Sequence, residues 1–190
     1  MIAALKNRGL WPERDKRTGR RHVVVEYDYT DEHGHLLYQV VRTEPKGFFQ
    51  RYSDGKGGWT NRKHCRQVLY RLPKVIKSEI VFIVEGEKDV ETLEVNGFTA
   101  TTLAGGANAK WLPSFTEALR GTQVVLIPDN DLPGWALMRR VAESVLGHAA
   151  CVVCFDDHHR AGAKDITEWF ESGHGECEFM YLLEAAWRTK

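Results

Sequence analysis

Two stretches of the sequence decide the fold: IVFIVEGEKDVETL at Ile80–Leu93 and VVLIPDNDLPG at Val124–Gly134. Each begins with a continuous apolar run of strand length, which is typical of a β-strand that is buried on both faces. Each run leads into acidic residues, a glycine and then a helical pattern. A strand that leads into a helix, found twice, predicts βα units and a parallel sheet.

Two further apolar runs, Phe98–Leu103 and Ala149–Phe155, extend this pattern outward and predict two more strands. The predicted helices are a segment that ends before Gly97, Asn108–Leu119, a segment from Pro133 to Gly147, Lys164–Glu171 and Glu178–Arg188. We therefore predict an α/β domain at residues 78–190, with a parallel four-stranded sheet flanked by helices.

Residues 1–77 have a different character. His22–Tyr29 and Leu36–Arg42 are rich in β-branched and aromatic residues, and the sequence TDEHGH that joins them has turn chemistry, so they predict an antiparallel hairpin. Val68–Arg71 is a further candidate strand. These features predict a small β-rich subdomain before the α/β domain.

The charge of the chain is split between these two parts. The whole chain has 190 residues and a formal net charge of zero. Residues 1–77 carry 17 Lys and Arg against 8 Asp and Glu, a net charge of +9, whereas residues 78–190 carry 9 against 18, a net charge of −9. The basic part indicates a polyanion partner, and the acidic part indicates either cation binding or a solvated surface.

The composition excludes other classes of protein. At 43% hydrophobic and 27% charged residues, the chain is globular rather than disordered. Its longest wholly apolar run, Ala149–Phe155, is far shorter than the roughly 20 residues of a membrane helix. Because no signal peptide is visible before Lys6, we expect a cytoplasmic protein with no membrane partner.

Acidic residues follow three of the predicted strands, and those after the fourth strand are Asp156 and Asp157. Glu85 follows the first strand, and Asp129 and Asp131 follow the third. If these strands are neighbours, the three carboxylates converge at the carboxyl edge of the sheet. Two carboxylates about 5 Å apart repel by roughly 3 kcal/mol at an effective dielectric constant of about 20, so the cluster favours a divalent cation. Oxygen ligands without His or Cys favour Mg²⁺ or Mn²⁺; the alternative is a set of solvated loop acids.

Two other acids are candidate ligands with structural alternatives. Asp89 lies one helical turn after Glu85, where it faces the same cleft or stabilises the helix N-terminus. Asp165-Ile-Thr-Glu168 matches a capping box, with Asp165 as the N-cap, and this role is compatible with metal binding.

Cations and aromatic residues alternate in the basic part. The candidate phosphate contacts there are Arg51, Lys56, Arg62 and Lys63, beside Phe48, Phe49, Tyr52 and Trp59. Such a pattern is typical of single-stranded nucleic acid binding, although the aromatic residues could equally form a small core. Lys88 and Lys110 are candidate contacts to a nucleotide phosphate, and Gly105-Gly106 before Lys110 is either a phosphate-binding loop or a strand-to-helix turn.

These motifs resemble the Toprim domain of DnaG-type primases, topoisomerases and OLD-family nucleases. In that family one strand ends in a catalytic Glu-Gly and another ends in Asp-x-Asp, as VFIVEGEKD and VVLIPDND do here. The resemblance covers about residues 79–173 and implies a Toprim-type sheet. It implies that Glu85 is the general acid or base, that Asp129 and Asp131 hold Mg²⁺ or Mn²⁺, and that Asp89 and Asp165 match further acidic positions of the family.

Within that family, the order of segments is most similar to primases of phages and mobile elements. The segments are YDYTDEHGHLLYQVVR, GGW, VLYRLP, VEGEKDVETL and AGGANAKW. This resemblance implies primer synthesis from nucleoside triphosphates on a single-stranded DNA template, with a replicative helicase as a further candidate partner. The sequence has neither a zinc ribbon nor a Walker A motif, which indicates a fragment of a larger protein or a minimal version. The alternatives are a Toprim nuclease and an inactive nucleic-acid-binding replication accessory.

Overall fold

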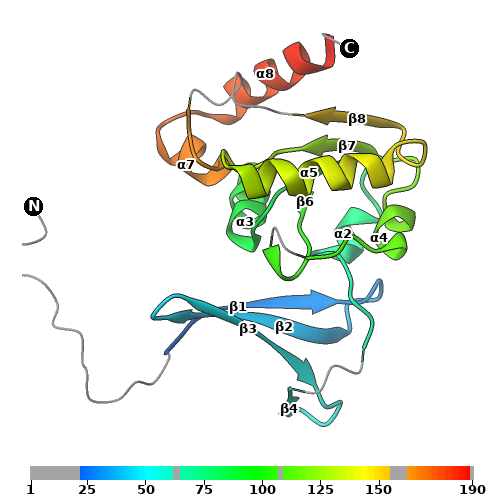
Figure 1. Cartoon of the computed structure of the whole chain (residues 1–190), viewed down its shortest axis with the longest axis vertical. Helices are drawn as coiled ribbons and strands as arrows, with labels where there is room; N and C mark the ends of the chain where they lie inside the picture. The colour runs from blue at the N-terminus through cyan, green and yellow to red at the C-terminus, as the bar shows by residue number, and fades with distance from the viewer. Residues whose placement is uncertain (1–21, 62–64, 107–108, 155–161, 189–190) are drawn as a thin grey trace, which may run out of the picture.

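The computed structural model of the chain describes residues 22–61, 65–106, 109–154 and 162–188. Figure 1 shows an antiparallel sheet at one end of the molecule and a helix-covered parallel sheet at the other. The α/β class and the β-rich N-terminal part are therefore confirmed.

The antiparallel sheet has the strand order β1-β2-β3-β4. Its first two strands form the predicted hairpin, with Tyr29 opposite Tyr38. The strands are β1 (His22–Thr30), β2 (Leu36–Glu44), β3 (Gly47–Ser53) and β4 (Trp59–Thr60). The segment predicted as a strand at Val68–Arg71 forms only an isolated bridge, between Leu69 and Leu103, before the short helix α2 (Leu72–Val75). Pro73 in the first turn of α2 explains this correction, because proline favours a helix start.

The parallel sheet has the order β6-β5-β7-β8, and all three pairings are parallel. Its strands are β5 (Ile80–Ile83), β6 (Ala100–Thr101), β7 (Gln123–Leu126) and β8 (Cys151–Cys154). β5 and β6 are shorter than the apolar runs that predicted them, whereas β7 is shifted by one residue relative to its run, Val124–Ile127. The first and third predicted strands, β5 and β7, are neighbours, with Ile83 opposite Leu126. The condition for convergence of the acidic residues is therefore met.

Helices cover both faces of this sheet. They are α3 (Glu87–Val95), α4 (Pro113–Ala118), α5 (Leu132–Val145), α7 (Ile166–Glu171) and α8 (Glu176–Arg188). Residues 109–112 are not helical, so the predicted helix Asn108–Leu119 begins late, at Pro113, where proline suits the first helical position. None of the helices in the described residues combines the length and apolar character that crossing a membrane requires.

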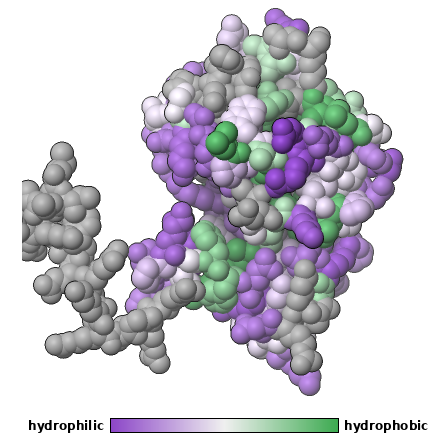
Figure 2. Space-filling view, viewed as in Figure 1, coloured by the Kyte–Doolittle hydropathy of each residue, from purple (hydrophilic) through white to green (hydrophobic). Residues whose placement is uncertain are grey.

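Two apolar cores result from the alternation of side chains along the strands. Val81 and Val124 point into a core with α4 and α5. Phe82 and Val125 point into the other core, which α3, α7 and α8 complete, and which also contains buried tyrosines of the antiparallel sheet such as Tyr29. This core is continuous across Lys77, where the sequence places the domain boundary, and that boundary remains a prediction. On the face drawn in Figure 2, apolar side chains are scattered among polar ones.

Candidate acidic site at the edge of the parallel sheet

Glu85 and Asp129 follow the adjacent strands β5 and β7 and meet at the first turn of α5. A Cβ atom added to Gly134 would lie 2.8 Å from the carbonyl oxygen of Asp129 and 2.9 Å from Oε2 of Glu85. Both residues are therefore in close approach to the same glycine. Gly134 lies within α5, and its importance is the space that a side chain would fill.

The other four predicted acidic residues act electrostatically on Asp129 at this edge. The pKa of Asp129 is raised to about 7, mainly by burial and then by the negative charges of Glu85, Asp89, Asp165 and Asp131. Such a shift means that the ionised form of Asp129 is unfavourable in the protein alone. The structure thus brings together the candidate ligands that lie up to 80 residues apart in the sequence, Glu85 and Asp165.

Asp89 is the most deeply held of these acids. Its side chain lies on α3 and is buried, and its Oδ1 accepts hydrogen bonds from the hydroxyl of Thr167 at 2.6 Å and from the backbone N–H of Thr167 at 3.3 Å. Burial is the main cause of its raised pKa. Thr167 was not identified from the sequence, because only the packing of α3 against α7 places it there. Asp89 therefore joins these two helices at the site.

Asp131 and Asp165 both cap helices. Oδ1 of Asp131 accepts from the backbone N–H of Gly134 at 2.8 Å, and Oδ1 of Asp165 accepts from that of Glu168, also at 2.8 Å. The N-cap role predicted for Asp165 is thus confirmed. The carboxyl group of Glu168 accepts from the backbone N–H of Lys164 instead of that of the cap residue, a variant of the capping box.

The donor chemistry of this edge fits a hard divalent cation. All five candidate ligands offer carboxylate oxygens, and a cation would offset the charge repulsion that raises the pKa of Asp129. In the part of the chain that the structure describes, no three His, Cys, Asp or Glu side chains are already arranged to hold a metal ion.

The candidate phosphate contacts lie in several places. Arg51 is engaged within its own sheet, where it contacts Glu26 at 2.6 Å and lies 4.2 Å from the ring centre of Trp59. Lys88 is exposed and pairs with Glu171 at 3.0 Å. Lys56 and Lys110 are exposed. Arg62 and Lys63 lie outside the described residues. The binding role of all six remains a prediction.

The glycine pair before Lys110 lies between β6 and α4. Gly105 and Gly106 have φ angles of 109° and 61°, which glycine adopts without strain. The helix α4 begins only at Pro113, seven residues after Gly106. Whether the pair binds a phosphate or only forms a strand-to-helix turn remains as the sequence left it.

No protein-family model matches the sequence, and no match was found among the curated proteins. Solved structures do share the fold. The primase fragment of the bacteriophage T7 primase-helicase protein is similar with a TM-score of 0.59 and 22% identity, over 83% of this chain and 60% of its own length. A DNA primase domain from Pseudomonas aeruginosa is similar with a TM-score of 0.61 and 19% identity, over 96% of this chain and 58% of its own length.

The DnaG catalytic core gives a comparable result, with a TM-score of 0.60 and 19% identity over 97% of this chain and 59% of its own length. The chain therefore has an α/β fold of the primase type. It spans about 60% of the length of the T7 primase fragment.

Proposed function

We propose that this chain is a Toprim-type nucleotidyltransferase that synthesises primers on single-stranded DNA from nucleoside triphosphates. The observation that carries the proposal is that Glu85 and Asp129 follow adjacent parallel strands and both lie against Gly134, in a primase-type fold. The raised pKa of Asp129, caused by burial and by the neighbouring carboxylates, agrees with this arrangement. An acidic cluster at the carboxyl ends of parallel strands is a suitable place for a cation-dependent phosphoryl transfer.

Each acid has a separate role in this proposal. Glu85 accepts the proton of the attacking 3′-hydroxyl group as a general base. Asp129 and Asp131 hold Mg²⁺ or Mn²⁺, and Asp89 and Asp165 are further ligands or orient the first two. The bound cation would neutralise charge on the triphosphate and on the leaving pyrophosphate. Thr167 keeps Asp89 in place through its two hydrogen bonds.

The partners follow from the same reasoning. Lys56, Lys110 and the basic segment that includes Arg62 and Lys63 would contact the phosphates of template and substrate. A replicative helicase is a candidate partner, because one structural neighbour is a fragment of a primase-helicase protein.

A direct test uses the full chain, labelled nucleoside triphosphates, a single-stranded template and a plasmid, with Mg²⁺ or Mn²⁺. We expect short primers from the wild-type chain and a loss of about 100-fold or more in Glu85→Gln, as for removal of a general base. Glu143→Gln removes the same charge from an exposed position of α5 and should retain activity.

Other results would identify the alternatives. Cation-dependent nicking of the plasmid without primer synthesis would replace the proposal with a nuclease. DNA retention without either reaction, unaffected by Glu85→Gln, would show a nucleic-acid-binding accessory instead.

A further inference from the structure

Helix α3 carries a row of glutamates that face the N-terminal part of the chain. Glu87, Glu91 and Glu94 are spaced by four and three residues, so they lie on one face of the helix. Glu87 accepts a hydrogen bond from the hydroxyl of Tyr29 at 2.8 Å. The hydroxyl of Tyr70 lies 3.4 Å from Oε1 of Glu91. This face of α3 therefore contacts residues that precede the parallel sheet.

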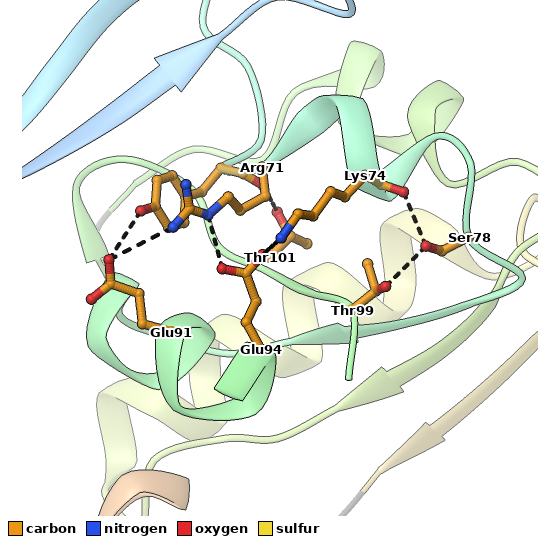
Figure 3. A network of polar contacts seen from close by, with 8 residues as sticks. Arg71, Lys74, Ser78, Glu91, Glu94, Thr99 and Thr101 are labelled. Carbon is orange, nitrogen blue, oxygen red and sulfur yellow. Dashed lines mark hydrogen bonds and ion pairs between the residues drawn. The ribbon is translucent and has the colours of Figure 1, made fainter. Parts of the chain in front are cut away.

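The same face continues to the end of the helix. Nε of Arg71 donates to Glu94 at 3.0 Å, and Nζ of Lys74 donates to the other oxygen of Glu94 at 2.5 Å (Figure 3). Thr101 of β6 adds a hydrogen bond from its hydroxyl to the backbone carbonyl of Tyr70 at 2.7 Å. The junction between the two parts is thus fastened to α3 and to the parallel sheet by several polar contacts.

The N-terminal end of α3 also bears the acidic site. Glu85 precedes the helix by two residues, and Asp89 lies in its first turn. The N-cap is Gly86, which has no side chain, so no side-chain hydrogen bond caps this helix. Glycine restricts the backbone least of all residues. The direction of Glu85 relative to α3 therefore depends on contacts made by the first turn, together with the hydrogen bond that the hydroxyl of Thr102 donates to the backbone carbonyl of Glu85 at 2.8 Å.

Two side chains supply such contacts. Asp89 bonds to Thr167 on one side, and Glu87 bonds to Tyr29 on the other. Glu87 is only 9% exposed and Tyr29 is fully buried. The ring of Tyr29 is stacked on that of Tyr38, with 4.7 Å between ring centres. A hydroxyl on such a fixed ring is a rigid donor, and hydrogen bonds to buried charged acceptors are among the stronger ones.

We propose that Tyr29 is a positioning residue for the acidic site: its hydroxyl holds Glu87, and through it the first turn of α3, so that Glu85 and Asp89 are directed at Asp129. This inference rests on the proposed function only in taking the acidic site as the cation site. It connects the N-terminal antiparallel sheet to the acidic edge of the parallel sheet through one hydrogen bond.

The test compares Tyr29→Phe with Tyr38→Phe in the full chain. Both tyrosines are fully buried and stacked on each other, but the hydroxyl of Tyr38 donates to the backbone carbonyl of Val68 and not to α3. Each substitution removes one buried hydroxyl and keeps the ring. Binding of Mn²⁺ is measured by electron paramagnetic resonance at a temperature where all variants are folded, and thermal unfolding is followed separately.

We expect Tyr29→Phe to weaken Mn²⁺ binding by about tenfold, the lower end of the effect of residues that orient metal ligands. Tyr38→Phe should lower the melting temperature without this loss of affinity. Glu87→Gln keeps an oxygen that can accept from Tyr29, so its Mn²⁺ affinity should exceed that of Glu87→Ala. In primer synthesis, Tyr29→Phe should lower kcat more than it raises the KM for the template.

Equal Mn²⁺ affinities in Tyr29→Phe and Tyr38→Phe would overturn the inference, since the hydroxyl would then have only a structural role. A wild-type chain that binds no Mn²⁺ would overturn it as well. If the wild-type chain binds Mn²⁺ and shows the predicted loss in Tyr29→Phe but makes no primers, the inference holds and the proposed function fails.

Discussion

Substitution of Gly134 by alanine tests the close approach of α5 to the acidic site. In an ordinary helix interior, Gly→Ala stabilises by about 1 kcal/mol. Here the new Cβ would lie 2.8 Å from the carbonyl oxygen of Asp129, 2.9 Å from its backbone nitrogen and 2.9 Å from Oε2 of Glu85. Two of these three atoms belong to the backbone and cannot rotate away. The expected effect is therefore opposite in sign to the usual one.

The magnitude follows from the two opposing effects. Overpacking costs about 1–3 kcal/mol, and the backbone contacts indicate the upper end of that range. After the gain in helix propensity, we expect a net loss of about 2 kcal/mol. For a chain of this size, that loss lowers the melting temperature by about 4–8 °C.

Thermal unfolding and Mn²⁺ titration of Gly134→Ala provide the measurement. Because Glu85 must move, Mn²⁺ affinity should fall together with stability. Gly175→Ala is the matched control, because Gly175 directly precedes α8 and a Cβ added there would meet nothing within 4 Å. Its stability should change by less than about 0.5 kcal/mol. A melting temperature of Gly134→Ala equal to or above that of the wild type would refute the reasoning.

Three further predictions concern charge. The pKa of Asp129 is raised from 3.8 to about 7 in the folded chain, so the folded state binds this proton more tightly than the unfolded state does. In a chelator, the melting temperature should therefore fall as the pH rises from about 4 to about 7, and Asp129→Asn should flatten this dependence; an unchanged slope would contradict the assignment. Glu94→Ala should lower the free energy of unfolding by about 1–2 kcal/mol in urea denaturation, because Glu94 is only 14% exposed and accepts from two cations. Glu184→Ala breaks an exposed ion pair with Arg188 at 3.6 Å and should change the free energy of unfolding by less than about 0.5 kcal/mol. Equal losses of stability in Glu94→Ala and Glu184→Ala would argue against the contribution of burial. Lys56→Ala and Lys110→Ala should each weaken binding of single-stranded DNA and reduce its salt dependence by about one unit of slope in fluorescence anisotropy; no change would remove that lysine from the interface.

Periodicity predicted the architecture better than it predicted the limits of its elements. The four apolar runs became the parallel strands, because a continuous apolar run is buried on both faces of a sheet. The apolar character of Val68–Arg71 predicted a strand, yet the local preference of Pro73 for a helix start prevailed there. The same preference of Pro113 delayed the start of α4.

The acidic site was partly predictable for a related reason. Glu85 and Asp129 directly follow apolar strands, and the carboxyl ends of parallel strands share one edge. The backbone of Gly86, the N-cap of α3, is extended, and a Cβ there would lie 3.2 Å from Oδ2 of Asp89. The close approach of the Asp89 carboxylate therefore explains why glycine suits position 86, and only the folded chain defines this approach.

The sequence by itself determined the α/β class, the position of acids at strand ends and the division of charge between the two parts, because these depend on neighbouring residues in the chain. The tertiary structure decided that β5 lies beside β7, since strand order is not encoded in any local pattern. It also decided the contacts of α3, where Tyr29 reaches Glu87 across 58 residues and Thr167 reaches Asp89 across 78. Such contacts depend on the packing of whole elements, and no single segment of the sequence specifies them.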